Sequence, residues 1–497
     1  MAAKIVACGL SFELPDGREL FRNLDLSLGG GVAALVGPNG AGKSCLARVL
    51  AGELAPLAGV VHRQVPVRLL PQRHAPEPIT VAQFLGADRD WAPVRAQLMR
   101  DIDLRGACTA LSGGQWMRVR LAQALGDHFL ILDEPTNDLD REGRQAVDTF
   151  LRHHEGGALV ISHDRELLRS CREFLELSNR GLQSFSGGWS AYAEAKERER
   201  ARLSAALELA KRERDTAMVR QVEQQERQQK RSSRGAASAA RGGMPAILAG
   251  ARARRAQVAR GKLDAQALER LHAAVTATHE ALHDLKVEPL MYARLSGREL
   301  PAGKLVAEAR GFNVRFRDWL YAKDLNFTWH GSVRVALQGA NGSGKTTLVR
   351  ALLGDTFRTR GELRRGAISA VYVDQRCSML DDTRSLLDNI LGVAPGTVTQ
   401  LRTALASFLF SEDKVFQKVG DLSGGERLRA ALARGFLGSQ EPQLLVLDEP
   451  TNNLDFENVA FLENLLRRFR GALVVISHDE PFLANCEVSQ ELVVGRS

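Results

Sequence analysis

Two related stretches decide the fold: "LVGPNGAGKSCL" at residues 35–46 and "LQGANGSGKTTL" at residues 337–348. Both contain the pattern G-x-x-x-x-G-K-[ST], which starts at Gly37 in the first and at Gly339 in the second. An apolar run precedes the glycines in each copy, and residues with helical spacing follow them. The pattern predicts a buried strand, a phosphate-binding loop and a helix, which together form the centre of an α/β domain.

Four further segments repeat in the same order, displaced by about 302 to 315 residues. They are "LLPQR" and "VYVDQR", "LSGGQWMRVRLAQAL" and "LSGGERLRAALARGF", "LILDEPTNDLD" and "LVLDEPTNNLD", and "GALVISHD" and "GALVVISHD". Short apolar strands alternate with helical segments in both copies. We therefore expect two tandem α/β domains, at 1–188 and 304–497, each with a mainly parallel sheet between helices.

The segment between the repeats, 189–303, differs in composition. Its first half is rich in helix formers, and Leu203, Leu207 and Ala210 begin an apolar stripe. A second run has a heptad-like spacing from Leu268 to Leu285. We expect a long α-helical hairpin whose two helices join near 232–250, where Ser, Gly, Ala and Pro collect.

The glycine-rich loops have the chemistry of polyphosphate binding, since their backbone N–H groups can point at phosphate oxygens. Lys43 and Lys345 are expected to reach the β- and γ-phosphates, and the hydroxyls of Ser44 and Thr346 to reach Mg²⁺. The expected nucleotide-binding residues are Gly37, Pro38, Asn39, Gly40, Ala41, Gly42, Lys43, Ser44 and Cys45, with Gly339, Ala340, Asn341, Gly342, Ser343, Gly344, Lys345, Thr346 and Thr347.

Adjacent carboxylates end an apolar strand in each repeat. Asp133 and Asp448 are placed to anchor Mg²⁺, and the glutamates that follow them to orient or deprotonate the attacking water. A histidine follows a further strand in both copies; a lone histidine is more often structural, but the repeated placement favours a catalytic role. The expected catalytic residues are Lys43, Lys345, Glu134, Glu449, His163 and His478.

The order of these segments resembles that of ATP-binding cassette ATPases over nearly 400 of the 497 residues. The resemblance implies ATP and Mg²⁺ as ligands, and that the LSGGQ-like segment of each cassette caps the ATP bound to the other. Ser112, Gly113, Gly114 and Gln115 would then face the nucleotide on Lys345, and Ser423, Gly424, Gly425 and Glu426 the one on Lys43. It also implies that Gln72 and Gln375 couple Mg²⁺ to domain movement, so that the metal-site residues are Ser44, Gln72, Asp133, Thr346, Gln375 and Asp448.

The two sites differ in detail. The family often stacks adenine on an aromatic residue about 23 positions before the glycine-rich loop, and Phe316 fits this position in the second cassette. Its counterpart in the first is Leu14, with Phe12 on the same strand face. Cys45 follows the first loop where the second has Thr347, and Glu426 replaces the Gln of LSGGQ. We expect two unequal sites that both keep their catalytic residues.

Three features resemble the ABC-F family of twin-cassette ATPases that bind the ribosome. No run of about 18 apolar residues is present. Both copies read PTN-x-LD after the carboxylates, and "GGWSAY" precedes the helical linker. In that family the linker enters the exit-tRNA site, and its tip approaches the P-site tRNA and the peptidyl-transferase centre. The resemblance leaves housekeeping, stress and antibiotic-protection roles open.

The charges of the linker agree with an RNA partner. From Arg227 to Lys262 there are ten basic residues and no acidic one. Residues 190–290 hold 20 basic and 13 acidic side chains, so this segment carries +7 of the net charge of +8. Arginine-rich stretches without carboxylates suit phosphate and RNA contact. We expect rRNA and tRNA to bind this stretch.

Two other classes remain open: the ATPase component of a membrane exporter and a DNA-maintenance ATPase. The 40 residues from Gln72 to Ser112, against 48 from Gln375 to Ser423, leave little room for an inserted arm or for a groove that receives exporter helices. No zinc module and no longer coiled coil is visible. Without a signal peptide or C-xx-C pair, we expect a cytoplasmic monomer with reduced thiols, no C-terminal extension, and pairing of its own two cassettes.

Overall fold

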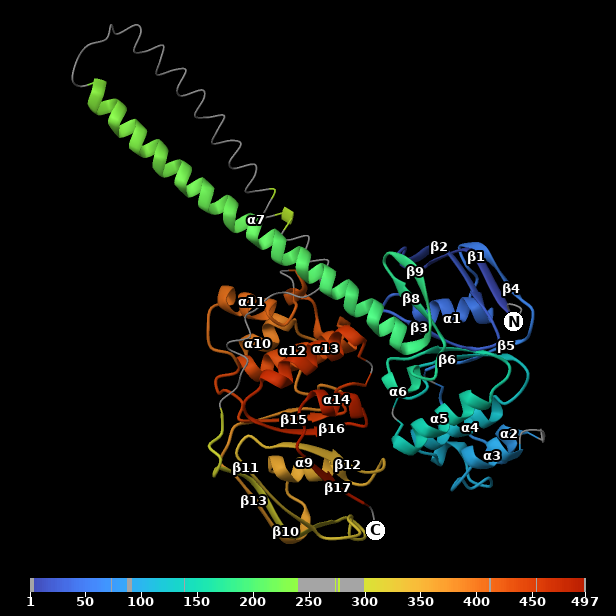
Figure 1. The fold of residues 1–497 in the computed structure, drawn as a ribbon. Helices are drawn as coiled ribbons and strands as arrows, with labels where there is room; N and C mark the ends of the chain where they lie inside the picture. Colours follow the sequence, from blue (N-terminus) through green and yellow to red (C-terminus); the bar gives the residue numbers. More distant parts are fainter. Residues whose placement is uncertain are drawn as a thin grey trace. The chain divides into compact units, whose positions relative to one another are not determined.

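The computed structural model describes residues 4–72, 74–86, 92–137, 139–239, 273, 276–277, 299–410, 413–452 and 454–495, without the side chains of 92, 93, 141, 221 and 224–239. The chain divides into two compact units. One contains both repeats, Met1–Tyr192 and Met291–Ser497, and the other is Ala193–Leu290. The repeats are the two cassettes expected from the sequence (Figure 1).

The first cassette contains two sheets. An antiparallel sheet has the order β2-β1-β4, and a six-stranded sheet has the order β5-β6-β7-β3-β8-β9, parallel except for β9. The strands are β1 (Ile5–Glu13), β2 (Glu19–Leu28), β3 (Val32–Val36), β4 (Ala58–Arg63), β5 (Val67–Leu70), β6 (Phe129–Asp133), β7 (Ala158–Ile161), β8 (Glu173–Ser178) and β9 (Gly181–Ser186). The helices are α1 (Lys43–Ala51), α2 (Val81–Leu85), α3 (Ala92–Leu98), α4 (Gly113–Gln123), α5 (Arg141–His153) and α6 (Arg165–Leu168).

The second cassette repeats this plan. Its antiparallel sheet has the order β11-β10-β13, and its parallel sheet has the order β14-β15-β16-β12-β17. The strands are β10 (Leu305–Arg315), β11 (Leu325–His330), β12 (Arg334–Gln338), β13 (Arg358–Arg365), β14 (Ala370–Val373), β15 (Leu444–Asp448), β16 (Ala472–Ile476) and β17 (Gln490–Val493). The helices are α9 (Lys345–Leu353), α10 (Leu386–Leu391), α11 (Val398–Ala406), α12 (Gly424–Leu437), α13 (Phe456–Arg468) and α14 (Glu480–Asn485).

The central strands are apolar throughout because both faces of the parallel sheet are covered. Phe129 and Ile131 of β6 pack with α1 and the antiparallel sheet, whereas Leu130 and Leu132 pack with α4 and α5. The same alternation along β15 separates the two cores of the second cassette. The carboxyl ends of these strands therefore meet at one edge of each sheet, where ligands bind in open α/β sheets.

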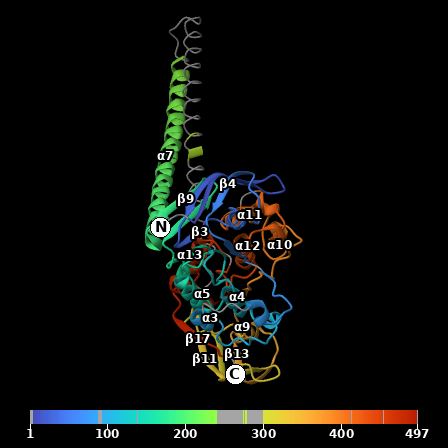
Figure 2. The same ribbon diagram turned by 90° about the vertical axis from the view of Figure 1, so that its right-hand side faces the viewer.

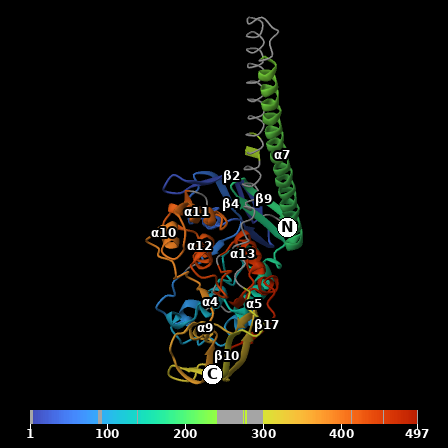
Figure 3. The ribbon, with the colours of Figure 1, turned by 90° about the vertical axis from the view of Figure 1, so that its left-hand side faces the viewer.

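The linker begins as one continuous helix, α7 (Gly188–Ala239), of 52 residues, which Figures 2 and 3 show from two sides. It extends further than the joint near 232–250 that the sequence suggested, because residues 232–239, placed in that joint from their composition, are helical. Leu207 and Ala210 are buried, as the stripe predicts. The joint beyond Ala239 and the run from Leu268 to Leu285 lie outside the described residues except for 273, 276 and 277.

The first turn of α7 belongs to the cassette unit, since Tyr192 stacks on Phe174 of β8 with 5.0 Å between ring centroids. The second compact unit starts at Ala193, and the division into 1–188, 189–303 and 304–497 stays a prediction. All six cysteines are unpaired thiols, as expected. Among the helices described, none combines the length and the apolar character needed to cross a membrane.

Candidate functional site

The two glycine-rich loops join β3 to α1 and β12 to α9 and have nearly the same backbone. Gly37 has φ 142° and Gly339 has φ 146°. A Cβ at Gly37 would lie 2.1 Å from the carbonyl oxygen of Leu177, and one at Gly339 would lie 2.2 Å from that of Val494. Only glycine fits at these positions, so each loop lies directly against the next strand of its sheet or the residue that follows it.

The loop lysines are buried and turn back onto the loop. Lys43 Nζ donates to the carbonyl oxygens of Gly37 at 2.7 Å and Pro38 at 3.0 Å. Lys345 Nζ donates to those of Gly339 at 2.6 Å and of the next residue at 3.2 Å. Burial lowers the pKa of both lysines, although nearby carboxylates oppose the shift. A buried, weakly hydrated ammonium gains from an anionic ligand.

The second loop also contains a buried hydroxyl, Ser343 Oγ, with no hydrogen-bond partner among the described residues. Polyphosphate oxygens accept from hydroxyls, backbone N–H groups and ammonium groups alike. The glycine backbone, the buried lysine and this hydroxyl therefore fit the phosphates of a nucleotide.

The hydroxyl that follows each lysine meets the aspartate at the end of the adjacent strand. Thr346 Oγ1 donates to Asp448 Oδ2 at 2.9 Å, and the Ser44 hydroxyl bonds to Asp133. Burial raises the pKa of both aspartates, while these hydroxyls and the loop lysines oppose the shift. An oxygen-rich pair of hydroxyl and carboxylate is the donor set that Mg²⁺ prefers.

A third group reaches the second of these aspartates. The Tyr372 hydroxyl donates to Asp448 Oδ2 at 3.2 Å. Burial, with the neighbouring carboxylate second, raises the pKa of Tyr372, so the phenol remains a donor. The sequence analysis missed this residue: its position three residues before Gln375, on an apolar strand, distinguishes it, but no local pattern indicates its contact with Asp448.

The two glutamines predicted to sense Mg²⁺ lie on loops after β5 and β14, and both are exposed. Gln375 lines a cavity of about 700 Å³ together with Asp448, Glu449 and Gly424. The structure thus brings Gln375 to the predicted metal and water positions of its own cassette. For Gln72 it gives the position in the chain after β5, and its contact with the metal stays a prediction.

Both predicted water-orienting glutamates have an unusual backbone. Glu134 and Glu449 each have φ 49°, a left-handed conformation that costs a non-glycine residue free energy. Their N–H groups donate to the carbonyl oxygens of Ile161 at 2.8 Å and Ile476 at 2.9 Å, which anchors each turn to the neighbouring strand. The same strain at both positions is what a functional constraint produces.

Each histidine predicted to be catalytic lies beside the glutamate of its own cassette. His163 Nε2 is 3.6 Å from Glu134 Oε1, and His478 Nε2 is 3.5 Å from Glu449 Oε1. Burial lowers the pKa of His163 to about 3 and that of His478 to about 4, so both rings are neutral at physiological pH. Burial raises the pKa of Glu134 to about 8. Glu134 can therefore take up a proton near neutral pH, while the ring of His163 stays neutral beside it.

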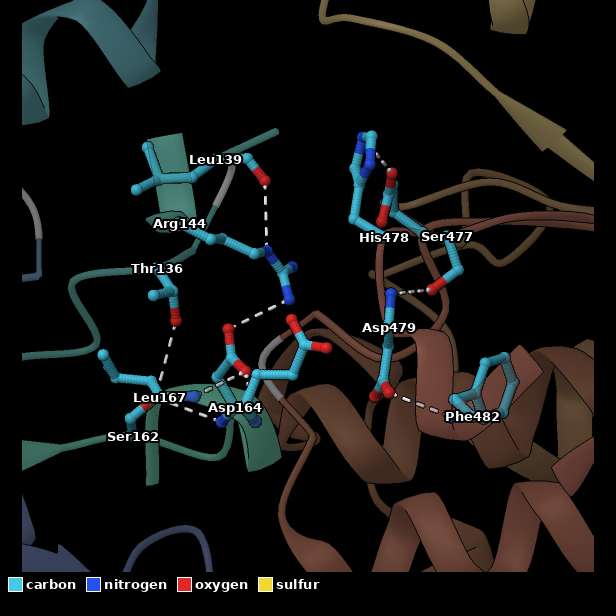
Figure 4. A network of polar contacts seen from close by, with 12 residues as sticks. Thr136, Leu139, Arg144, Ser162, Asp164, Leu167, Ser477, His478, Asp479 and Phe482 are labelled. Atoms are coloured by element: carbon cyan, nitrogen blue, oxygen red, sulfur yellow. Dashed lines mark hydrogen bonds and ion pairs between the residues drawn. The ribbon is translucent and has the colours of Figure 1, made fainter. Parts of the chain in front are cut away.

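The turns that hold the histidines are alike, and Figure 4 shows the flanking Ser162 and Asp164 of the first turn and Ser477, His478 and Asp479 of the second. The Asp164 N–H donates to Ser162 Oγ, and the Asp479 N–H donates to Ser477 Oγ, both at 3.1 Å. Each aspartate also caps the following short helix, α6 or α14. Arg144 adds an ion pair to Asp164 at 3.0 Å. The histidine between each serine and aspartate is thus held by its flanking residues.

The loops contact the opposite cassette through two aspartates that the sequence analysis did not single out. The Asn39 N–H donates to Asp455 Oδ2 at 3.0 Å, and the Asn341 N–H approaches Asp140 Oδ2 at 3.5 Å. Each aspartate also caps the helix that follows it, α13 or α5. They are the last residues of PTNNLD and PTNDLD, so the repeat marks both positions but does not indicate that they meet the opposite loop.

Further contacts between cassettes involve α13. The His163 ring meets Phe456 edge-on at 5.4 Å, and Arg165 pairs with Glu463 at 2.9 Å. The positions that correspond to this ion pair on the other side are Glu480 and Asp148, two acids. The ion pair therefore exists on one side of the duplication only.

The LSGGQ-like segments form the N-termini of α4 and α12. Ser112 and Ser423 are their N-caps, closed by Gln115 and Glu426 through capping boxes. Burial would raise the pKa of Glu426, but hydrogen bonds from Lys414 and Ser423 hold it below the ordinary value. The replacement of Gln by Glu is thus neutralised by a lysine. That the two LSGGQ-like segments face the nucleotide bound to the opposite cassette stays a prediction.

The aromatic residue expected to stack on adenine differs between cassettes. Phe316 is 61% exposed and forms a T-shaped pair with Phe357, with 6.2 Å between ring centroids, so much of its side chain is accessible. Phe12 is buried and stacks on Phe21, which excludes it as a substitute; Leu14 is half-buried.

The residue that follows Ser44 in the first cassette also differs from the one that follows Thr346 in the second. Cys45 packs against the apolar core, and Thr347 is half-buried.

Comparisons with known proteins agree with this geometry. The sequence profile described as "ABC transporter" matches residues 21–137 and 322–452. The chain is 32% identical over 488 residues to the ATP-binding protein Uup of Caulobacter vibrioides, over 95% of this chain and 74% of that protein. The chain belongs to the ABC-F family. As an ABC-F protein with two cassettes of a type that binds ATP, it is an ATPase.

Two further similarities cover nearly the whole chain. This ABC-F protein is 28% identical over 507 residues to the ribosome protection protein VmlR of Bacillus subtilis strain 168, over 99% of this chain and 87% of that protein. Its fold is similar to a chain in the crystal structure of the complex of archaeal ribosomal stalk protein aP1 and archaeal ribosome recycling factor aABCE1. The TM-score is 0.61, with 18% identity and coverage of 98% of this chain and 87% of that one.

Proposed function

We propose that this ABC-F ATPase hydrolyses Mg²⁺–ATP at two composite sites and couples closure of its cassettes to binding of the ribosome through its basic linker. The observation that carries the proposal is the contact of each loop with the other cassette, Asn39 with Asp455 and Asn341 with Asp140. A nucleotide bound at one loop would therefore be sensed by both cassettes. The cassettes of one chain pair with each other, which supports a monomer.

The loop of Lys43 would form the first site. The LSGGQ-like segment Ser112–Gln115 would cap the nucleotide at the second site, on Lys345. Lys43 and Lys345 bind the β- and γ-phosphates. The metal would be held at the first site by Ser44, Gln72 and Asp133, and at the second by Thr346, Gln375 and Asp448. Mg²⁺ would neutralise the negative charge that builds up on the phosphates.

The proton chemistry belongs to the glutamates and histidines. Glu134 and Glu449 orient the attacking water and accept its proton, and the neutral rings of His163 and His478 hold these carboxylates in place. The contacts of 3.6 Å and 3.5 Å are loose, as hydrogen bonds of catalytic groups often are before substrate binds. The segment Ser423–Glu426, with Lys414 beside it, would close over the nucleotide on Lys43.

The linker supports the choice of partner. Arg227, Lys230, Arg231 and Arg234 lie on α7, and the ten basic residues that end at Lys262 are not offset by any acid. Such a stretch suits rRNA and tRNA phosphates. VmlR, which matches 99% of this chain, is called a ribosome protection protein.

The test is sucrose-gradient sedimentation of the Glu134→Gln, Glu449→Gln protein with ATP and cell lysate. Loss of the base is expected to slow hydrolysis by about 10²–10⁴-fold and to trap the closed protein on the ribosome. The matched control replaces two exposed carboxylates outside the sites, Glu155→Gln with Glu441→Gln, and should leave both turnover and sedimentation unchanged. Movement with membranes instead would favour the ATPase of an exporter, and movement with duplex DNA a DNA-maintenance role.

A further inference from the structure

The two aspartates predicted to anchor Mg²⁺ are held differently. Asp448 Oδ2 accepts from Thr346 Oγ1 at 2.9 Å and from the Tyr372 hydroxyl at 3.2 Å. The two donors come from α9 and β14, so they reach the same oxygen from separate elements. Because Asp448 is only 9% exposed, water competes little with either bond. The carboxylate therefore has one fixed orientation.

The position of Tyr372 follows from the sheet. β14 pairs in parallel with β15, and Tyr372 lies opposite Val446, two residues before Asp448. The ring is half-buried and packs on the apolar cluster between β15 and α9. The core thus fixes the ring, and the ring carries its hydroxyl to the end of the neighbouring strand.

Among the described residues of the first cassette, the position equivalent to Tyr372 carries no donor. β5 pairs with β6 in the same register, and Leu69 lies opposite Ile131, two residues before Asp133. Leu69 occupies the place of Tyr372, and a leucine side chain cannot donate a hydrogen bond. The Ser44 hydroxyl bonds to Asp133, as Thr346 does to Asp448. The difference between the two aspartates is therefore the phenol.

We propose that Tyr372 is a positioning residue for the second site alone: it holds Asp448 in the orientation that binds the divalent cation and makes this site bind cation with nucleotide more tightly than the first. The inference rests on the proposed assignment of Asp448 to Mg²⁺. Partners of metal-binding carboxylates fix their orientation, and loss of such a partner typically weakens metal binding by about 10–100-fold.

The test measures Mn²⁺ binding by electron paramagnetic resonance in the presence of a non-hydrolysable ATP analogue, with the full chain. Lys43→Ala removes the first site, so that the second is observed alone, and Lys345→Ala does the reverse. In the Lys43→Ala protein, Tyr372→Phe is expected to raise the Kd for Mn²⁺ by about 10-fold or more. In the Lys345→Ala protein the same substitution should leave the Kd unchanged. Phenylalanine keeps the ring in the core, and thermal unfolding checks that the fold is retained.

Two results would overturn the inference: an unchanged Kd in the Lys43→Ala, Tyr372→Phe protein, or an equal loss of affinity in both backgrounds, which would indicate a general effect on the fold. A different result concerns the proposed function. If the parent protein with both lysines intact binds no Mn²⁺ with the analogue, the assignment of these sites to Mg²⁺–ATP is wrong, and the inference about Tyr372 falls with it.

Discussion

Asn39 and Asp455 are 416 residues apart in the chain, and the N–H of the first donates to the carboxylate of the second at 3.0 Å. This hydrogen bond joins the first glycine-rich loop to the second cassette. The corresponding contact on the other side, from Asn341 to Asp140, measures 3.5 Å. The duplication has thus kept the arrangement but not its distances.

This difference predicts unequal effects of aspartate substitutions. Asp455→Ala removes the contact with Asn39 and the cap of α13, so we expect a loss of about 1 kcal/mol in stability and a several-fold loss of ATPase activity. Asp455→Asn retains an acceptor oxygen and should be close to the parent. Asp140→Ala also removes a helix cap, that of α5, but the contact with Asn341 that it breaks is longer, so we expect a smaller loss of ATPase activity. Thermal unfolding and ATPase assays decide; equal losses of turnover in the two alanine proteins would contradict the expectation.

The pKa of Glu134 predicts a pH dependence for the first site. Glu134 accepts a proton only when it is ionised, and burial raises its pKa to about 8. In the Glu449→Gln protein, where only the first site turns over, kcat/KM should therefore rise as pH increases through about 8 and fall below that value. Steady-state rates across this range measure it. A flat profile would show that the free enzyme has Glu134 already ionised.

The glycine-rich loop predicts a strict demand at Gly37. Gly37→Ala puts a Cβ 2.1 Å from the carbonyl oxygen of Leu177 at φ 142°, so we expect loss of nucleotide binding at the first site, with binding at the second site retained, and a destabilisation of about 1–3 kcal/mol. Gly29→Ala is the control, because nothing lies within 4 Å of its Cβ position and its φ is not positive. Binding of a fluorescent ATP analogue and thermal unfolding report on both. Normal nucleotide binding at the first site by the Gly37→Ala protein would show that this loop is not part of the nucleotide site.

The ion pair between Arg165 and Glu463 should stabilise the contact of the cassettes. Its side chains are 18% and 7% exposed, and Asn485 also donates to Glu463 at 3.0 Å. Either charge-removing substitution to Gln is expected to cost about 1.5–3 kcal/mol in urea unfolding, with a clear coupling energy in a double-mutant cycle. Arg152→Gln breaks the more exposed pair with Asp148 and should cost less than about 1 kcal/mol. Additive effects in the cycle would refute a direct interaction.

The linker charges predict a change in salt dependence. Replacing Arg227, Lys230, Arg231 and Arg234 by Gln should weaken ribosome binding and reduce the slope of log K against log salt by about 0.7–0.9 for each lost phosphate contact. Basal ATPase activity should survive. The matched control neutralises four exposed arginines of the second cassette, Arg310, Arg317, Arg358 and Arg364, and should leave the slope unchanged. Equal slopes for the two proteins would exclude these linker residues from the RNA contact.

Much of this architecture could be predicted because it depends on patterns among residues that are close together in the sequence. The glycines of the loops, the apolar strands that end at Asp133 and Asp448, and the stripe at Leu207 and Ala210 all depend on neighbours in sequence. The position of each histidine after a further strand was also read from the sequence, whereas its contact with the glutamate of the adjacent parallel strand was found only in the structure.

The features that could not be predicted depend on contacts between segments that are far apart in the sequence. Nothing near Asn39 indicates that Asp455 will meet it, and nothing in "VYVDQR" alone shows that the second residue of the segment will reach Asp448. The end of α7 was placed too early because Ser and Ala in 232–239 are compatible with helix as well as with a joint. The buried position of Phe12 depends on Phe21, which packs on it from the next strand.

The backbone conformation of Glu134 and Glu449 lowers the stability of the protein at two residues that turnover needs. Each residue occupies a left-handed conformation that costs of order 1 kcal/mol or more, and a glycine there would relieve the strain while removing the base. Selection for heat resistance alone would therefore favour losing these glutamates. A descendant that kept both cassettes but no longer needed to release its partner would become a more stable pseudoenzyme by substitution of both glutamates.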